Sequence, residues 1–200
     1  MRKKSHISLA KYLLNSAGME ALQKHKKAFY VGSILPDCVP SFITRRHSIE
    51  ETFAVLRDEI CKITENYKVE KGAGSYYCRH LGVITHYVAD YFTFPHNEIF
   101  SGSIKEHCIY EKHLKHALKE YVNSDTAQRI REKMRIFHSV DELLAYIWTM
   151  HAEYLKAIKE VGIDCHYIVE LSHKVVDAIL QFLEYSLHEK QLYTKGCSQG

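Results

Sequence analysis

Two histidine and carboxylate pairs constrain the fold of this 200-residue chain more than any other feature. His86 precedes Asp90 by four positions, and His107 precedes Glu111 by the same interval. Residues four apart lie on one face of an α-helix, so each pair can grip a single ion if its segment is helical. His96 lies between the pairs, directly after a proline where the chain must turn. If the two segments form an antiparallel helical hairpin, all five side chains line one pocket.

The rest of the composition favours helices throughout. With 9 Gly and 3 Pro the chain can form long uninterrupted helices, and alternating strand patterns are hard to find. A hydrophobic content of 46% suffices for one buried core, and no polar or Pro/Gly/Ser-rich linker divides the chain. We therefore expect an all-α fold, with residues 1–200 forming one multi-helix domain and a metal cluster between helices.

Apolar periodicity and capping signatures place the expected helices at about residues 5–26, 48–69, 75–92, 103–122, 126–137, 139–161 and 164–189. Gly32 and two nearby prolines are expected to prevent a continuous helix after the first one, which places Asp37 on a loop. Ser48 and Glu51 have capping-box spacing, and Asp164 is expected to cap the last helix.

Charge and cysteine usage exclude little. The formal net charge of +3 comes from 27 basic and 24 acidic residues scattered together, and it names no partner. Six cysteines without a C-x-x-C pair indicate reduced thiols, although their even number leaves disulfides open. Lys11 and Asn15 interrupt the apolar start, so we expect no signal peptide and a cytoplasmic protein. No apolar run reaches the roughly 20 residues of a membrane-spanning helix.

Simpler interpretations compete with metal binding. The chain has 14 histidines, and histidine and carboxylate pairs at this spacing often form only surface ion pairs. Two pairs with a histidine on the turn between them favour a metal site. His113 and His116, with the lysines at 112, 115 and 119, are expected to form a solvated helix face without a special role. Arg45 and Arg46 are candidates for steering a phosphate, and Tyr30, Phe42 and Phe94 for lining a substrate cleft.

One combination of residues resembles a known family. It consists of His6, the stretch 32–37 ending in Asp37, His47, His86, Asp90, His96, His107 and Glu111. Its order and most of its spacings resemble the bacterial zinc-dependent phospholipase C family, which has an all-helical fold. The resemblance covers residues 6–111, and residues 112–200 add helices without a matching motif.

The resemblance implies a site with two or three zinc ions. The resemblance implies that one zinc ion would be held by Asp37, His47, His86 and Asp90. A second zinc ion would be held by His96, His107 and Glu111. A third would be bound in part by His6 and by Asp90, which would bridge two ions. Asp37 is also the family's candidate for general base. The implied activity is hydrolysis of a phospholipid or another phosphodiester by a metal-activated water, with peripheral membrane contact.

The chain departs from the family pattern at two points. Secreted members complete the third metal site with the amino group of a processed N-terminal tryptophan, whereas five residues beginning with Met1 precede His6 here. We therefore expect the third site to lack that ligand. Choline-selective members have aromatic residues where this chain has Cys38 and Thr44, so a preference for phosphatidylcholine does not follow.

Two alternative functions stay open at this stage. The helical single-strand nucleases have a similar trinuclear zinc site, so nucleic acid stays among the candidate partners. A non-catalytic helical protein with a structural or regulatory metal would also fit an incomplete third site.

Overall fold

The computed structural model describes residues 1–16, 20–39, 46–131 and 135–197, and these residues form helices without a strand. The helical elements are α1 (Lys3–Ser16), α2 (Glu20–Lys24), α3 (Lys26–Ile34), η1 (Leu35–Asp37), α5 (Ile49–Ile63), η2 (Val69–Lys71), α6 (Ser75–Tyr91), η3 (Phe94–His96), α7 (Ile104–Tyr121), α8 (Asp125–Arg131), α9 (Val140–Lys156) and α10 (Val161–Cys197). The predicted all-α class is confirmed. None of the described helices is both long and apolar enough to cross a membrane.

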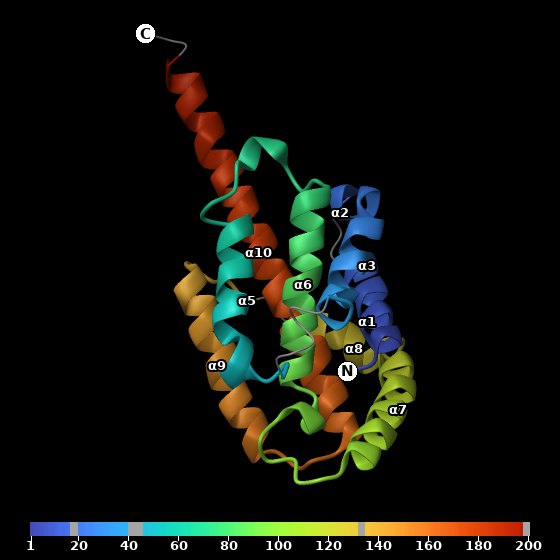
Figure 1. Cartoon of the computed structure of the whole chain (residues 1–200). Helices are drawn as coiled ribbons and strands as arrows, with labels where there is room; N and C mark the ends of the chain where they lie inside the picture. Colours follow the sequence, from blue (N-terminus) through green and yellow to red (C-terminus); the bar gives the residue numbers. More distant parts are fainter. Residues whose placement is uncertain (17–19, 40–45, 132–134, 198–200) are drawn as a thin grey trace.

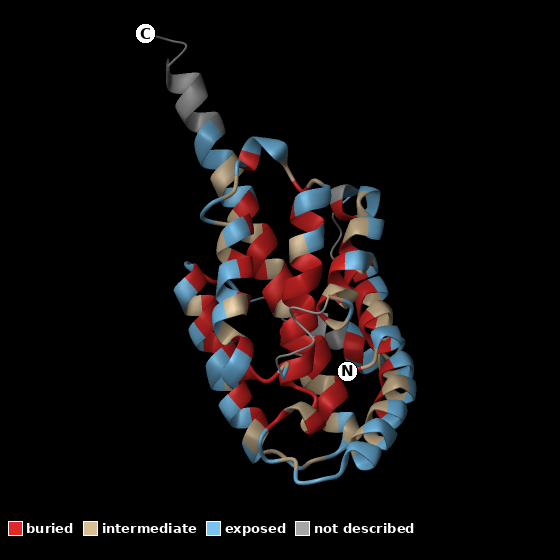
Figure 2. Ribbon diagram, in the orientation of Figure 1, coloured by how far each residue is buried: buried red, intermediate tan, exposed pale blue. Residues whose placement is uncertain are grey.

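Helix α6 forms the centre of the bundle. It packs against α3, α5 and α10, and Figure 1 shows it between them. Every residue from 81 to 93 is buried, as the red central ribbon in Figure 2 shows. His86 and Asp90 therefore lie in the interior, where polar groups need partners.

Two glycines allow α3 and α6 to approach each other closely. A Cβ atom on Gly32 would meet the carbonyl oxygen of Arg79 at 2.0 Å, and one on Gly82 would meet that of Phe29 at 2.3 Å. The expectation that Gly32 interrupts a helix is wrong, because the residue lies inside α3. Because glycine has no side chain, Gly32 leaves room for the backbone of α6 at the contact between the two helices.

Other boundaries also differ from those expected. The first predicted helix corresponds to α1 and α2, between which residues 17–19 are not described, and Asp37 ends the short 3-10 helix η1 instead of lying on an irregular loop. Ser48 precedes α5 but its side chain makes no capping hydrogen bond, and Glu51 instead accepts one from the backbone N–H of Arg46. Phe42 and Arg45, the candidates for lining the cleft and steering a phosphate, lie outside the described residues, as does Thr44.

Candidate metal centre

Three side chains from two segments meet beside the buried part of α6. His47 Nδ1 lies 3.0 Å from both Asp90 Oδ2 and His86 Nε2, and His86 Nε2 lies 3.1 Å from the same carboxylate oxygen. In a tetrahedral zinc site with bonds of about 2.0–2.1 Å, neighbouring ligand atoms lie about 3.3 Å apart. The three atoms therefore fit one zinc ion with only small adjustments.

A hydrogen bond to α3 orients the His86 ring. His86 Nδ1 lies 2.9 Å from the carbonyl oxygen of Ser33, which can only accept a hydrogen bond, so Nδ1 carries a hydrogen. When Nε2 carries none, its lone pair faces the Asp90 carboxylate at 3.1 Å, and this contact is repulsive without a cation or proton between the two groups. A hydrogen bond from the other ring nitrogen to a carbonyl is the usual support for a metal-binding histidine. The close contact of α3 with α6 puts the Ser33 carbonyl in place.

A second group lies where α6, η3 and α7 come together. His96 Nε2 and His107 Nε2 each lie 3.3 Å from Glu111 Oε1. These distances also match the edge of a zinc tetrahedron. The ligand atoms of His96, His107 and Glu111 all lie within 4.8 Å of one another, although α7 packs mainly against α1 and α10 and not as a hairpin partner of α6.

His6 on α1 is a buried histidine beside His86. Its ring is 1% exposed and stacks on His86 with the ring centroids 3.9 Å apart. Among the described residues neither ring nitrogen finds a hydrogen-bond partner, although Nε2 lies 3.4 Å from Asp90 Oδ1. Buried polar atoms are normally satisfied, so a bound cation fits here. The ligand atoms of His6 group with those of Asp37 and His86, whereas the family resemblance pairs His6 with Asp90.

The amino group of Met1 reaches the same cluster. Its nitrogen lies 2.6 Å from Asp90 Oδ1, 2.7 Å from His96 Nε2 and 3.2 Å from Glu111 Oε1. In its charged form this group offsets the charge of the two carboxylates.

The electrostatics favour positive charge at the centre. Burial alone would raise the pKa of Asp90, but the Met1 ammonium and the neighbouring histidines hold it well below its usual value. Burial likewise opposes ionisation of Glu111, yet hydrogen bonds with His107 and His96 lower its pKa. Burial and the nearby His86 lower the pKa of His6 to about 3. At neutral pH the site therefore has two carboxylates and a neutral His6, which are the forms that bind metals.

Asp37 connects this cluster to solvent. Its Oδ1 lies 3.8 Å from His47 Nδ1 and 3.9 Å from His86 Nε2, and its side chain is 23% exposed. It lines two cavities, one of about 480 Å³ that also includes Arg46, and one of about 600 Å³ beside Met1 and Glu111. Asp37 thus lies between the histidines and the space that a substrate could enter.

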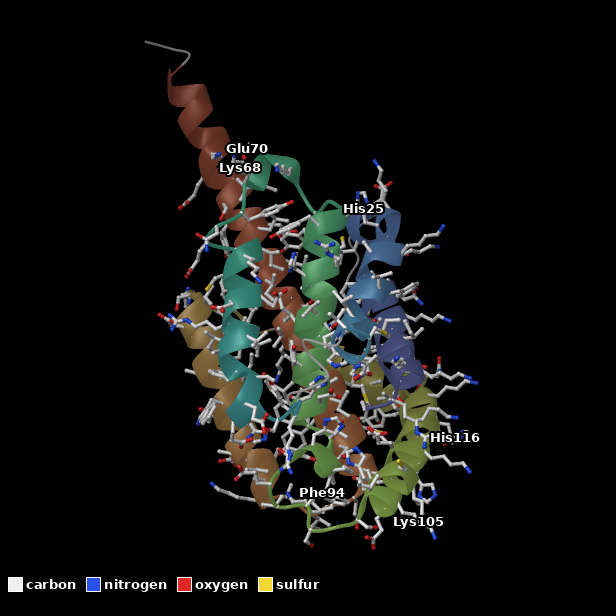
Figure 3. All side chains as sticks on the ribbon, in the orientation of Figure 1. His25, Lys68, Glu70, Phe94, Lys105 and His116 are labelled. Atoms are coloured by element: carbon white, nitrogen blue, oxygen red, sulfur yellow. The ribbon has the colours of Figure 1, made fainter. Side chains whose placement is uncertain are left out.

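The aromatic residue that lines the cavity beside Asp37 is not one of those expected from the sequence. Phe100 lines the cavity of about 480 Å³. Phe94 instead packs against Phe100 and Tyr110, with ring centroids 5.3 Å and 5.8 Å away, respectively. Figure 3 shows Phe94 at the end of the bundle near η3. Because Phe94 precedes His96 by two residues, its packing helps to fix the turn that carries this histidine.

Sequence reasoning missed the residue that anchors this turn. Asp164 was expected to cap the last helix, but it lies inside α10 and is fully buried. Its carboxylate accepts hydrogen bonds from the Phe94 backbone N–H at 2.8 Å, from Tyr110 at 2.9 Å and from Tyr154 at 2.7 Å. Burial raises the pKa of Asp164 to about 6 despite these donors. The only sequence signal was an acidic residue among apolar neighbours.

A second buried contact holds the other side of the turn. Asn97 donates hydrogen bonds to the carbonyl oxygens of Tyr91 and Thr93, at 3.2 Å and 2.9 Å. His151 on α9 lies 2.7 Å from the Asn97 side-chain oxygen. His151 is thus a buried histidine with a hydrogen-bond partner. Helices α9 and α10 therefore support the turn that carries His96.

Replacing Asp164 with alanine is expected to lower the free energy of unfolding by roughly 3 kcal/mol, because three donors lose a buried acceptor. The same change should weaken zinc binding by His96, and both effects can be measured by chemical denaturation and zinc titration. Asp141→Ala is the matched control, since that side chain is 82% exposed and only 3.5 Å from Arg57 in a surface ion pair. Equal stability and zinc affinity in the two variants would contradict an anchoring function for Asp164.

Comparison with known proteins assigns the class. The family model described as zinc dependent phospholipase C matches residues 5–161, which is most of the chain. The chain therefore belongs to the zinc-dependent phospholipase C family. The match extends beyond residues 6–111 into α9 and the start of α10. Searches of curated proteins and of solved structures found no match.

Proposed function

We propose that this protein is a zinc-dependent hydrolase that cleaves phosphodiesters in the manner of a phospholipase C. The single observation that carries the proposal is the position of Asp37, between the His47, His86 and Asp90 cluster and a cavity of about 480 Å³. Family membership supports zinc as the metal and a phosphodiester as the substrate. The eight predicted metal ligands, the number of ions and the cytoplasmic location stay predictions.

Each group of residues has a definable task in this proposal. When bound, zinc would polarise the phosphate oxygens and lower the pKa of a water molecule to about 7. Asp37 would accept a proton from the attacking water, since its carboxylate faces the cavity. Arg46 lines the same cavity and would orient the phosphate, because a guanidinium group can donate two parallel hydrogen bonds to it. His86 would be held in its metal-binding tautomer by the Ser33 carbonyl.

The ligand arrangement supports catalysis over a purely structural metal. Structural zinc sites usually have four protein ligands, whereas catalytic sites usually have three and leave a position open. The two groups that share no residue, one around Asp90 and the other around Glu111, each contain three side chains among the described residues. His96, His107 and Glu111 also line the cavity of about 600 Å³, so a substrate could reach an ion bound by them.

Metal removal gives a direct test. The protein loaded with zinc is expected to hydrolyse bis-p-nitrophenyl phosphate and phosphatidylcholine vesicles, and a chelator should abolish both activities until zinc is restored. Single-stranded DNA is the comparison substrate for the nuclease alternative, which would show faster cleavage of DNA than of lipid. Hydrolysis that is unchanged by the chelator would contradict the proposal. Tightly bound zinc without any hydrolysis would instead favour the non-catalytic alternative.

A further inference from the structure

A groove lined by lysines runs between α1 and α7. The two helices pack against each other, and Figure 1 shows them side by side. The groove has a volume of about 460 Å³, and its lysines are Lys3, Lys4 and Lys11 on α1 and Lys115 and Lys119 on α7. The sequence predicts that the α7 lysines form a solvated face, because a single sequence does not show that α1 lies beside α7. We call this surface the lysine groove.

The charge of the lysine groove is not balanced locally. Within the part of the chain that the structure describes, none of its five lysines forms an ion pair with a carboxylate. Other lysines do, since Lys62 pairs with Glu59 at 2.6 Å and Lys156 with Glu153 at 3.5 Å. No aspartate or glutamate occurs among the described lining residues. The groove therefore concentrates positive charge on a chain whose formal net charge is only +3.

The floor of the lysine groove is apolar. Ile7 on α1 and Ile34 at the end of α3 line it and are half-buried. Lysine side chains can cover such surface with their methylene stems while the ammonium groups reach outward. This combination suits the headgroup region of a lipid bilayer, where phosphates lie next to apolar groups.

Single-stranded nucleic acid suits the groove less well. Proteins that bind such strands stack the bases on aromatic side chains. The described lining residues of the lysine groove include no Phe, Tyr or Trp. Figure 3 shows His116, which also lines the groove, on the outer side of α7.

The lysine groove continues into the metal centre. Lys3, Lys4 and Lys115 line both the groove and the cavity of about 600 Å³ that contains Glu111. His96 and Asp37 also line that cavity. A surface that contacts the groove would therefore lie next to the opening of the metal centre.

We propose that the lysine groove docks this protein on an anionic phospholipid bilayer. The inference rests on the proposed function, because the bilayer would present the phosphodiester substrate to the adjacent metal centre. The ammonium groups contact the lipid phosphates, and the apolar floor faces the upper part of the bilayer. Docking orients the cavity beside Met1 and Glu111 towards the membrane surface.

Vesicle sedimentation in the presence of a chelator tests docking without hydrolysis. The wild-type protein should bind vesicles of phosphatidylcholine mixed with phosphatidylglycerol, and binding should weaken as the salt concentration rises. Each lysine near an anionic membrane contributes about fivefold, so Lys11→Gln combined with Lys119→Gln should reduce partitioning about 25-fold. The control is Lys68→Gln with Lys71→Gln, two exposed lysines that leave the groove intact. Figure 3 shows Lys68 at the end of the bundle away from α7.

Three results would overturn docking by the lysine groove. The first is equal binding of the groove variant and the control variant to anionic vesicles. The second is equally strong wild-type binding to vesicles of phosphatidylcholine alone. The third is loss of single-stranded DNA binding in the groove variant while its vesicle binding is retained, which would make the groove a nucleic-acid site.

A separate assay keeps docking distinct from catalysis. Neither Lys11 nor Lys119 lines the cavities that contain Asp37. The zinc-loaded groove variant should therefore hydrolyse soluble bis-p-nitrophenyl phosphate at the wild-type rate but act more slowly on anionic vesicles. An inactive wild-type protein that still binds vesicles through the groove would contradict the proposed function and leave docking supported.

Discussion

Asp90→Asn is expected to lower zinc affinity at least about 100-fold and to abolish hydrolysis. Asp90 Oδ2 lies 3.0 Å and 3.1 Å from His47 and His86, while Oδ1 lies 3.4 Å from His6. The two oxygens thus face different histidines, as a carboxylate that bridges two ions would. Substitutions of residues that merely support metal ligands already cost 10- to 100-fold, so loss of the shared charge should cost more. Isothermal titration calorimetry measures the zinc affinity of the purified variant, and elemental analysis measures its zinc content.

His6→Gln provides the comparison for Asp90→Asn. His6 approaches one Asp90 oxygen, at 3.4 Å, whereas the other Asp90 oxygen lies close to two further histidines, so the loss of His6 should remove less zinc. Asp141→Asn controls for the loss of one carboxylate charge, because Asp141 is exposed and pairs with Arg57 instead of with a residue of the cluster. Equal zinc content in the Asp90 and His6 variants would contradict a bridging position for Asp90.

Asp37→Asn is expected to reduce the hydrolysis rate by about 10²- to 10⁴-fold, which is the usual contribution of a general base. An amide has the shape of the carboxylate but cannot accept the proton of the attacking water. Asp37 lies farther from His47 and His86, at 3.8 Å and 3.9 Å, than these histidines lie from Asp90. We therefore expect most of the zinc to be retained. Rates on bis-p-nitrophenyl phosphate, measured together with zinc content, separate the two effects.

The outcome of Asp37→Asn distinguishes a base from a ligand. A large rate loss at unchanged zinc content supports proton transfer by Asp37. Loss of zinc in parallel with the rate would show that Asp37 acts mainly as a ligand. Full activity with full zinc would contradict both functions. Asp141→Asn is the matched control, because that exposed carboxylate lies outside the cavity that Asp37 lines.

Local spacing predicted much of the candidate site. The pairs His86 with Asp90 and His107 with Glu111 require only helical periodicity, and the proline before His96 marks the turn. The structure places the two pairs in two adjacent groups, which approach each other where His96 Nδ1 lies 3.8 Å from Asp90 Oδ2. Asp37, His47 and His6 could be added only through the family resemblance, because each lies on a different element.

Residues that act through distant packing could not be predicted. Asp164 lies 70 positions from Phe94 and reaches its backbone only because α10 packs beside η3. Gly32 was read as a helix breaker, since the sequence does not show that α6 lies against it. The lysine groove required the same kind of information, namely that α1 and α7 are neighbours. All three features depend on which helices pack against each other. A single sequence does not show which helices are neighbours.

We propose that one zinc centre is formed by His6, Asp37, His47, His86, Asp90, His96, His107 and Glu111. Anomalous scattering at the zinc edge from a crystal of the zinc-loaded protein would locate the ions. We expect two or three zinc peaks clustered among these side chains, with one peak bound by both His86 and Asp90. A single isolated peak elsewhere, or no zinc bound by His86 and Asp90, would contradict the claim.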